Sequence, residues 1–233
     1  MRIALRNRGI RKFVRGIKQR TEKARERGLS LRETHINKTQ ITPRASAVQL
    51  QKIRTVLREA EKACARRNYS DAEKLLIQAL TTSPGSTDVQ AQLAKLYLLM
   101  DKDVKAEALY RDILLEDQHV SFYANLGLAC YKQGKFLESC EAYQDAYQLD
   151  PKNPERAAAF ARACMAALRF DAAVPLLEFA CERLPRDVSL LQMLGQSYEH
   201  LGLLKEAESA YMRIHRLQPY DEAVKQKLSE LTF

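Results

Sequence analysis

The stretch at residues 123–136 reads Tyr123-Ala124-Asn125-Leu126-Gly127-Leu128-Ala129-Cys130-Tyr131-Lys132-Gln133-Gly134-Lys135-Phe136. Its pattern recurs five times between residues 53 and 221. Small residues mark the register at intervals of 34, 33, 34 and 34: Ala72, Ala106, Ser139, Ala173 and Ala207. A nearly constant period of this length is typical of repeat proteins, so the chain is predicted to be a solenoid of five similar units.

Within one unit, the apolar residues have the spacing of a helix. Tyr123, Leu126, Gly127 and Cys130 stand at i, i+3, i+4 and i+7, which places them along one stripe of an α-helix. Each unit is therefore predicted to contain two amphipathic helices. Glycines between the two helices can supply a positive φ to the turn. They are Gly134 and Gly202.

Further residues predict where helices begin and end. Asn153 and Asp187 are predicted N-caps that open helix pairs, and Ser46 is predicted to cap a first long helix that continues through Arg66. Residues 222–232 have apolar residues on one face and polar residues opposite. This last segment is predicted to be a helix that covers the final repeat.

The quoted stretch, with Ser139, Tyr143, Ala146 and Pro151 after it, resembles the tetratricopeptide repeat consensus W-x2-L-G-x2-Y…A-x3-F…P almost residue for residue. This resemblance implies an all-α, right-handed superhelical solenoid of antiparallel helix pairs. The implied repeats span about 53–86, 87–119, 120–153, 154–187 and 188–221, within a solenoid at residues 46–233. Cys130 and Cys164 replace the consensus aromatic residue of the first helix.

Residues 1–45 form a basic N-terminal arm and linker. They contain 14 Lys and Arg against three Glu, a net charge of +11, which leaves −2 for the rest of a chain of net charge +9. An apolar row lies along one side of a predicted helix: Ile3, Ile10, Phe13, Val14 and Ile17. The predicted anionic-surface residues are Phe13 and the surrounding bases: Arg2, Arg6, Arg8, Arg11, Lys12, Arg15, Lys18 and Arg20.

Several uses of this arm stay open. A basic amphipathic segment can lie on an anionic membrane surface, bind nucleic-acid phosphates or act as an organelle transit peptide. A helix packed on the solenoid or a charged disordered tail are further alternatives. The apolar row favours the membrane surface, because phosphate binding requires no such row.

Composition and motifs limit which other classes of function are expected. No apolar run approaches the ~18 residues of a membrane span, and no signal peptide is visible. The five cysteines are expected to be small core residues in a reducing compartment, and the scattered histidines lack metal-ligand spacing. Nucleotide-binding, hydrolase and metalloprotease motifs are absent. We expect no enzyme activity, cofactor, metal or small-molecule substrate, and a cytoplasmic protein that can be peripheral at the inner face of a membrane.

The resemblance also implies a concave surface, lined by first helices, that binds an extended peptide or partner helix. The residues implied to face it are Gln92, Lys95, Leu99, Asn125, Leu128, Lys132, Ala159, Arg162, Met165, Gln192, Met193, Gln196 and His200. Asn125 falls where many such repeats carry an asparagine that binds the ligand backbone. A clamp for a terminal carboxylate is not expected, because Ala91 and Ala159 stand where it needs basic residues.

Three functions follow as predictions. The first is a non-catalytic adaptor or scaffold that binds a protein partner on the concave face and is tethered by its arm to an anionic surface. The second is a nucleic-acid- or ribosome-associated factor in which the arm is the main binding element. The third is a regulatory subunit of an enzyme encoded elsewhere.

Overall fold

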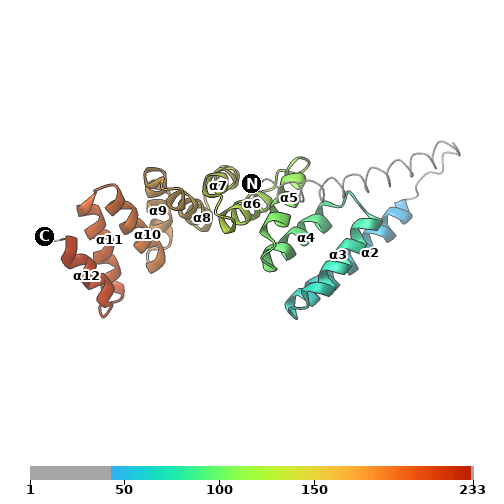
Figure 1. Cartoon of the computed structure of the whole chain (residues 1–233), viewed down its shortest axis with the longest axis horizontal. Coiled ribbons are helices and arrows are strands. Elements are labelled where there is room, and N and C mark those ends of the chain that lie inside the picture. The colour runs from blue at the N-terminus through green and yellow to red at the C-terminus, as the bar shows by residue number, and fades with distance from the viewer. Residues whose placement is uncertain (1–42, 232–233) are drawn as a thin grey trace, which may run out of the picture. The chain divides into compact units, whose positions relative to one another are not determined.

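The structure, a computed structural model, describes residues 43–231 (Figure 1). This range contains eleven α-helices and no strand, which confirms the predicted all-α fold. The helices are α2 (Pro43–Ala65), α3 (Tyr69–Thr82), α4 (Thr87–Leu99), α5 (Asp103–Leu114), α6 (Val120–Lys132), α7 (Phe136–Leu149), α8 (Pro154–Ala166), α9 (Phe170–Arg183), α10 (Val188–His200), α11 (Leu204–Leu217) and α12 (Glu222–Leu231). The predicted arm residues from Arg2 to Arg20 lie outside the described range.

The chain divides into two compact units, with the boundary between Ile113 and Leu114 in the sequence. In the first unit α3 packs against both α2 and α4. In the second unit each helix from α6 to α12 packs against the next. The division falls before the last residue of α5, which has 12 residues where α3, α7, α9 and α11 have 14. The shortened spacing in the sequence therefore coincides with the end of the first unit.

Helix α2 begins earlier than predicted. It starts at Pro43, so the prediction of Ser46 as its N-cap was wrong, and residues 43–45, which were predicted to be linker, are helical. Proline is accepted in a first helical turn because the N–H that it lacks would have no partner there and its φ already suits the helix. The predicted caps Asn153 and Asp187 are confirmed, since the Asn153 side chain accepts two backbone N–H groups of the following helix and the Asp187 side chain accepts one.

Each turn between the two helices of a repeat contains one residue with positive φ. The five are Arg67 (59°), Asp101 (53°), Gly134 (74°), Leu168 (59°) and Gly202 (72°), and they keep the same intervals as the small residues. The role predicted for the two glycines is confirmed. A left-handed backbone costs a residue with a Cβ roughly 1–2 kcal/mol, so Leu168 adopts the turn at an energetic cost that glycine avoids.

Close helix packing explains the repeated small residues. Ala72, Ala106, Ser139, Ala173 and Ala207 are all fully buried. In the third repeat, a Cβ added to Gly127 would lie 2.8 Å from the ring of Tyr143. In the fourth repeat, Ala161 and Leu177 hold the equivalent positions, and both are buried. A smaller residue on the first helix thus faces a larger one on the second.

Candidate functional site

The first helices of the second unit expose one column of side chains. Leu128 of α6, Arg162 of α8 and Gln196 of α10 hold the same repeat position, and all three are exposed. Leu128 is an apolar member, with 39% of its surface exposed. In the first unit, Lys95 of α4 holds this position and is also exposed. The column gives the first-helix face a mixture of apolar, basic and amide groups.

A hollow of about 310 Å³ opens beside this column between α6 and α8. It is lined by Ala124, Asn125 and Leu128 of α6, by Tyr143 and Ala146 of α7, and by Asn153, Glu155, Arg156 and Ala159 of the α8 end. Ala124, Ala146 and Ala159 leave the space because their side chains are short. The hollow has the size of a few amino-acid side chains.

Asn125 contributes a polar group to the wall of this hollow. Its side chain is half-buried and makes no hydrogen bond to any residue in the described part of the second unit. A carboxamide offers two N–H donors and one acceptor oxygen, which matches the N–H and C=O of a peptide bond. The hollow therefore contains an unoccupied group suited to a peptide backbone.

Arg162 adds a positive charge near Tyr143, which is one wall of the hollow. Its guanidinium is exposed and forms no ion pair with a described residue of the second unit. Burial raises the pKa of Tyr143 to about 12, and the charge of Arg162 opposes this rise. Arg162 is therefore close enough to act on the Tyr143 wall, and it can attract an anionic group of a ligand.

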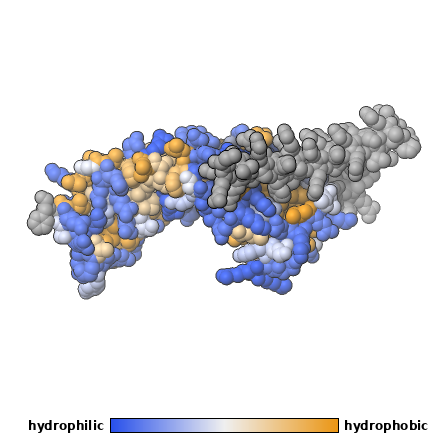
Figure 2. Space-filling model, viewed as in Figure 1, coloured by the Kyte–Doolittle hydropathy of each residue, from blue (hydrophilic) through white to orange (hydrophobic). Residues whose placement is uncertain are grey.

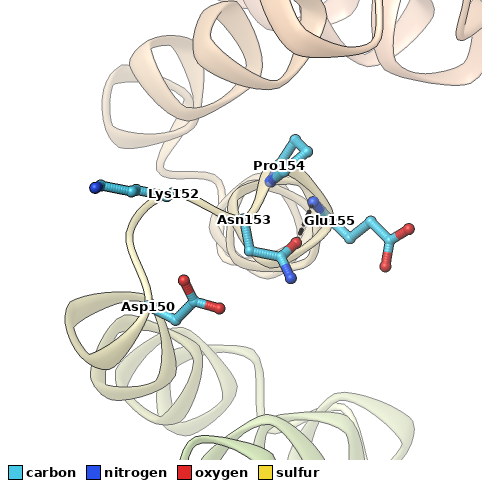
Figure 3. Close-up of a pocket in the computed structure, with 5 residues that line it drawn as sticks. All are labelled: Asp150, Lys152, Asn153, Pro154 and Glu155. Carbon is cyan, nitrogen blue, oxygen red and sulfur yellow. Dashed lines mark hydrogen bonds between the residues drawn. The ribbon is translucent and has the colours of Figure 1, made fainter.

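The α7–α8 turn, which is drawn in Figure 3, contributes Asn153 and Glu155 to one end of the hollow between α6 and α8. The Asn153 side-chain oxygen accepts the backbone N–H groups of Glu155 at 2.9 Å and of Arg156 at 3.3 Å. Arg156 Nε also donates to an Asp150 carboxylate oxygen at 3.0 Å. A shallow hollow of about 470 Å³ lies over this turn. Helix capping and the ion pair hold the wall in place.

The structure brings some of the predicted partner-binding residues together. Asn125, Leu128 and Ala159 line the hollow, whereas Lys132, Arg162 and Met165 lie outside its lining. Four predicted residues on α10 belong to the fifth repeat: Gln192, Met193, Gln196 and His200. In the first unit, Gln92 and Lys95 lie on α4, as does Leu99, and the Gln92 amide donates to Glu61 at 3.3 Å.

Other wall residues were missed by the sequence analysis. Asn153 was recognised only as a helix cap and Tyr143 only as a repeat core residue, yet both line the hollow. Glu155 and Arg156 gave no signal, because their role depends on how the α7–α8 turn is placed against α6. Repeat position can indicate first-helix residues, but it does not indicate what the preceding second helix contributes.

A second hollow lies between α9, α10 and α11 of the same unit. It measures about 440 Å³ and is lined by Glu178 and Glu182 of α9, Leu194 and Tyr198 of α10, and Glu206, Ser209, Ala210 and Arg213 of α11. The Tyr198 hydroxyl donates to Glu178 at 2.5 Å, so one carboxylate of this hollow already has a hydrogen-bond partner. Burial and this carboxylate raise the pKa of Tyr198. Nothing in this hollow resembles the unpaired amide of Asn125.

Apolar side chains also reach the surface at the turns within the fourth and fifth repeats. Leu168 is 76% exposed, and Leu203 and Leu204 are 41% and 53% exposed. The ring of Phe170 stacks on His200 with centroids 4.0 Å apart, which places the two turns side by side. Figure 2 shows hydrophobic surface over α9 in this part of the second unit. This edge is a second exposed apolar feature.

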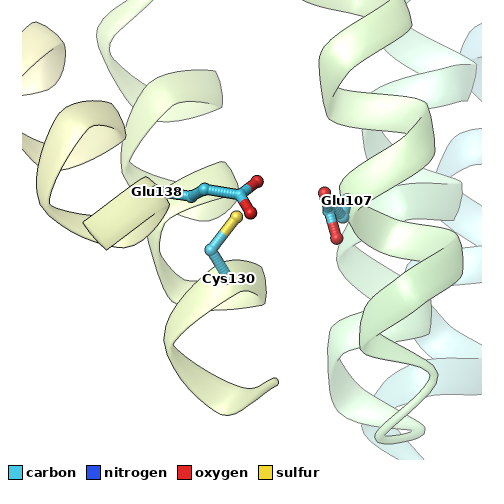
Figure 4. A group of neighbouring side chains, drawn as sticks. All are labelled: Glu107, Cys130 and Glu138. Carbon is cyan, nitrogen blue, oxygen red and sulfur yellow. The ribbon is translucent and has the colours of Figure 1, made fainter. Parts of the chain in front are cut away.

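Cys130 of α6 and Glu138 of α7 lie side by side in the second unit (Figure 4). Together they offer one sulfur and one carboxylate ligand, whereas a structural zinc site commonly uses four protein ligands. Glu107, also drawn there, belongs to the first unit, where it accepts from Arg111 Nε at 3.0 Å. The pair gives no basis for a metal site in the second unit, and the expected lack of metal stays a prediction.

No helix within residues 43–231 combines the length and the apolar character needed to cross a bilayer.

Family models support the sequence resemblance. Tetratricopeptide repeat models match residues 63–127, 120–153 and 158–222. The chain belongs to the tetratricopeptide repeat family. This result confirms the predicted family, and the repeat fold supports a general role in binding other proteins. No curated protein matches the sequence.

Solved structures of tetratricopeptide repeat proteins share the fold. A crystal structure of MamA protein is 17% identical, with a TM-score of 0.66, over 72% of this chain and 95% of its own. MamA from Desulfovibrio magneticus RS-1 is 12% identical, with a TM-score of 0.67, over 73% and 97%. YrrB, described as a tetratricopeptide repeat protein with an unusual peptide-binding site, is 14% identical, with a TM-score of 0.68, over 81% and 97%. At these identities the likeness concerns the fold alone.

Proposed function

We propose that this tetratricopeptide repeat protein is a non-catalytic adaptor that binds an extended peptide or helix of a partner protein on the first-helix face of its second unit. The observation that carries the proposal is the unpaired Asn125 amide in the wall of the hollow between α6 and α8. A half-buried amide that lacks a partner gains most from a ligand that supplies both a donor and an acceptor.

The walls define what the partner offers to the hollow. Ala124, Leu128 and Ala159 favour a small or medium apolar side chain, while Asn125 hydrogen-bonds to the adjacent backbone. Arg162 favours an anionic group next to that side chain. YrrB, whose fold is similar, is itself described as having a peptide-binding site, which supports a peptide as the ligand class.

The proposed interface continues along the column to Gln192, Met193 and Gln196 of α10, and it includes Lys132 and Met165 at the ends of α6 and α8. On the first unit, Gln92 and Lys95 are proposed to contact the partner as well. These residues are mostly exposed at the surface, so they are expected to form the rim of the interface, where single truncations have small effects.

The basic arm is proposed to tether the protein to an anionic membrane surface, consistent with a cytoplasmic protein that is peripheral at the inner face. The alternative is binding to nucleic acid or the ribosome, which would require the charge but not the apolar row of the arm. Replacing Ile10, Phe13 and Ile17 by alanine in the full chain separates the two. Liposome binding should be lost because roughly 2 kcal/mol of apolar transfer energy is removed per residue, with charge unchanged. RNA binding retained by the same variant would favour the alternative.

The peptide proposal is tested by measuring affinity. A peptide selected from a random library on the full chain is titrated against Asn125→Ala with Arg162→Ala, which should weaken binding about tenfold or more. The matched control is Gln144→Ala with Arg216→Ala, which also removes one amide and one guanidinium but from exposed positions of the second helices. Unchanged affinity in the first variant, or an equal loss in the control, would contradict the proposed site.

A further inference from the structure

Two buried cysteines face one another where the third repeat meets the fourth. Cys140 lies in α7 and Cys164 in α8, and their Sγ atoms are 3.0 Å apart. Both are free thiols, and their side chains are 2% and 1% exposed. Because a disulfide bond is about 2.05 Å long, a shift of roughly 1 Å would bring the two sulfurs to bonding distance.

The thiol pair is specific to this junction between repeats. At the equivalent junction in the first unit, two repeats earlier, the positions hold Glu73 and Tyr97, whose side chains hydrogen-bond to one another. Between the fourth and fifth repeats, one repeat later, they hold Val174 and Tyr198. The fold therefore places a second helix against the next first helix at each of these junctions, but only this one of the three presents two thiols.

We propose that Cys140 and Cys164 form a reversible disulfide, which makes this junction a redox modification site in the core of the second unit. Both S–H bonds break and one Sγ–Sγ bond forms. The two electrons and two protons pass to a low-molecular-weight disulfide, which is reduced to two thiols. The product links α7 of the third repeat covalently to α8 of the fourth.

The surroundings make the exchange slow and selective. Burial raises the pKa of the Cys164 thiol, with a further rise from Cys140. Of the neighbouring charges, Arg169 lowers this pKa and Asp171 raises it. Because a thiolate is the attacking species, the bond forms faster at alkaline pH. Because both thiols are buried, it forms when α7 and α8 separate transiently. Once formed, the disulfide is reduced slowly, because the same burial limits the access of reductants.

Cys181 of α9 provides a matched comparison. It is as buried as Cys164, with 1% of its side chain exposed, and burial raises its pKa to about 11. No described sulfur lies within hydrogen-bond distance of Cys181 in its own unit. The two sites share burial and differ in the presence of a second thiol, so only the Cys140 and Cys164 pair is expected to link.

The full chain is treated with oxidised glutathione at alkaline pH, and the remaining thiols are then alkylated in denaturant. Trypsin places each cysteine on a separate peptide, so the expected product is peptide 136–152 joined to peptide 163–169, with the other three of the five cysteines alkylated. The bridge closes a loop of 24 residues and should raise the melting temperature by roughly 5–10 °C, reversed by dithiothreitol. Cys181→Ser should retain the link and the shift, and Cys140→Ser should lose both.

The proposal is overturned if the joined peptide is missing under conditions that oxidise a small dithiol standard, or if Cys140 or Cys164 links to another cysteine instead. It is also overturned if Cys140→Ser shows the same rise in melting temperature. The peptide map uses the unaltered protein, so it decides the matter even where a serine variant does not fold.

Discussion

The third and fourth repeats of the chain both lie in the second unit, and they fill the same helix crossing with different residues. In the third repeat Gly127 faces Tyr143 and the turn uses Gly134, whereas in the fourth Ala161 faces Leu177 and the turn uses Leu168. The two helix pairs are otherwise alike, with first helices of 13 residues and second helices of 14. The repeat therefore specifies a combined volume at the helix crossing and a left-handed residue in the turn, without specifying which residue supplies either.

The largest expected effect on stability comes from placing a tyrosine in the fourth repeat at the position that Tyr143 holds in the third. Leu177→Tyr would force an aromatic ring against the Cβ of Ala161 and bury a hydroxyl at a fully buried position. Overpacking and an unpaired hydroxyl together should cost about 3 kcal/mol of unfolding free energy. Urea denaturation of the full chain measures the loss, and adding Ala161→Gly should restore at least about 1 kcal/mol. A double variant no more stable than Leu177→Tyr would contradict the combined-volume explanation.

The reverse exchange in the third repeat should have a smaller effect. Gly127→Ala places a Cβ 2.8 Å from the Tyr143 ring, which cannot rotate away because ring atoms near Cγ are involved. The higher helix propensity of alanine offsets part of the strain, so we expect a net loss of about 1 kcal/mol. In a double-mutant cycle with Tyr143→Leu, the double variant should lose about 1 kcal/mol less unfolding free energy than the sum of the losses of the two single variants. Strict additivity would show that the two residues do not share the volume.

A substitution in the turn of the fourth repeat should raise the unfolding free energy instead of lowering it. Leu168→Gly should raise the unfolding free energy by about 1 kcal/mol, because glycine adopts positive φ without strain and an exposed leucine contributes little packing. Gly202→Ala, at the equivalent turn, should lower it by a similar amount. Thermal melts of the two variants check the pair. A stabilising effect of Gly202→Ala would contradict the account of the turns.

The smallest expected effect concerns Ser139, the one repeat position where serine replaces alanine. Its hydroxyl donates to the Gly127 carbonyl oxygen at 2.8 Å inside the core. Ser139→Ala removes this bond but gains a better apolar fit, and the carbonyl keeps its helical partner, so the loss should be about 0.5 kcal/mol. A loss above about 2 kcal/mol in the same denaturation assay would mean that the hydroxyl has a larger role than the other repeats imply.

Sequence periodicity predicted the features that every repeat must share. The buried series from Ala72 to Ala207, the turn glycines and the caps at Asn153 and Asp187 follow from spacing and elementary helix geometry. Arg67 and Leu168 could not be recognised by type, because their side chains do not favour the left-handed conformation, whereas Asp101 is of a type that tolerates it. Their position in the period was the available signal.

The candidate site was harder to predict, since it depends on three helices at once. Asn125 and Leu128 could be placed on the first-helix face by their position in the repeat. The hollow beside them exists because three alanines on different helices converge, and Tyr143 closes it from the second helix. No local pattern encodes such a convergence, so the volume and its polar wall emerged only from the folded chain.

The main proposal is that a partner peptide lies in the hollow beside Asn125, and site-specific crosslinking is its sharpest test. A photoreactive residue is placed at Leu128 in one variant and at Met212 in another, since these side chains are similarly exposed, 39% and 41%, on first and second helices of the same unit. The selected peptide should crosslink from position 128 and not from position 212. Crosslinking from position 212 alone, with position 128 silent, would contradict the assignment of the binding face.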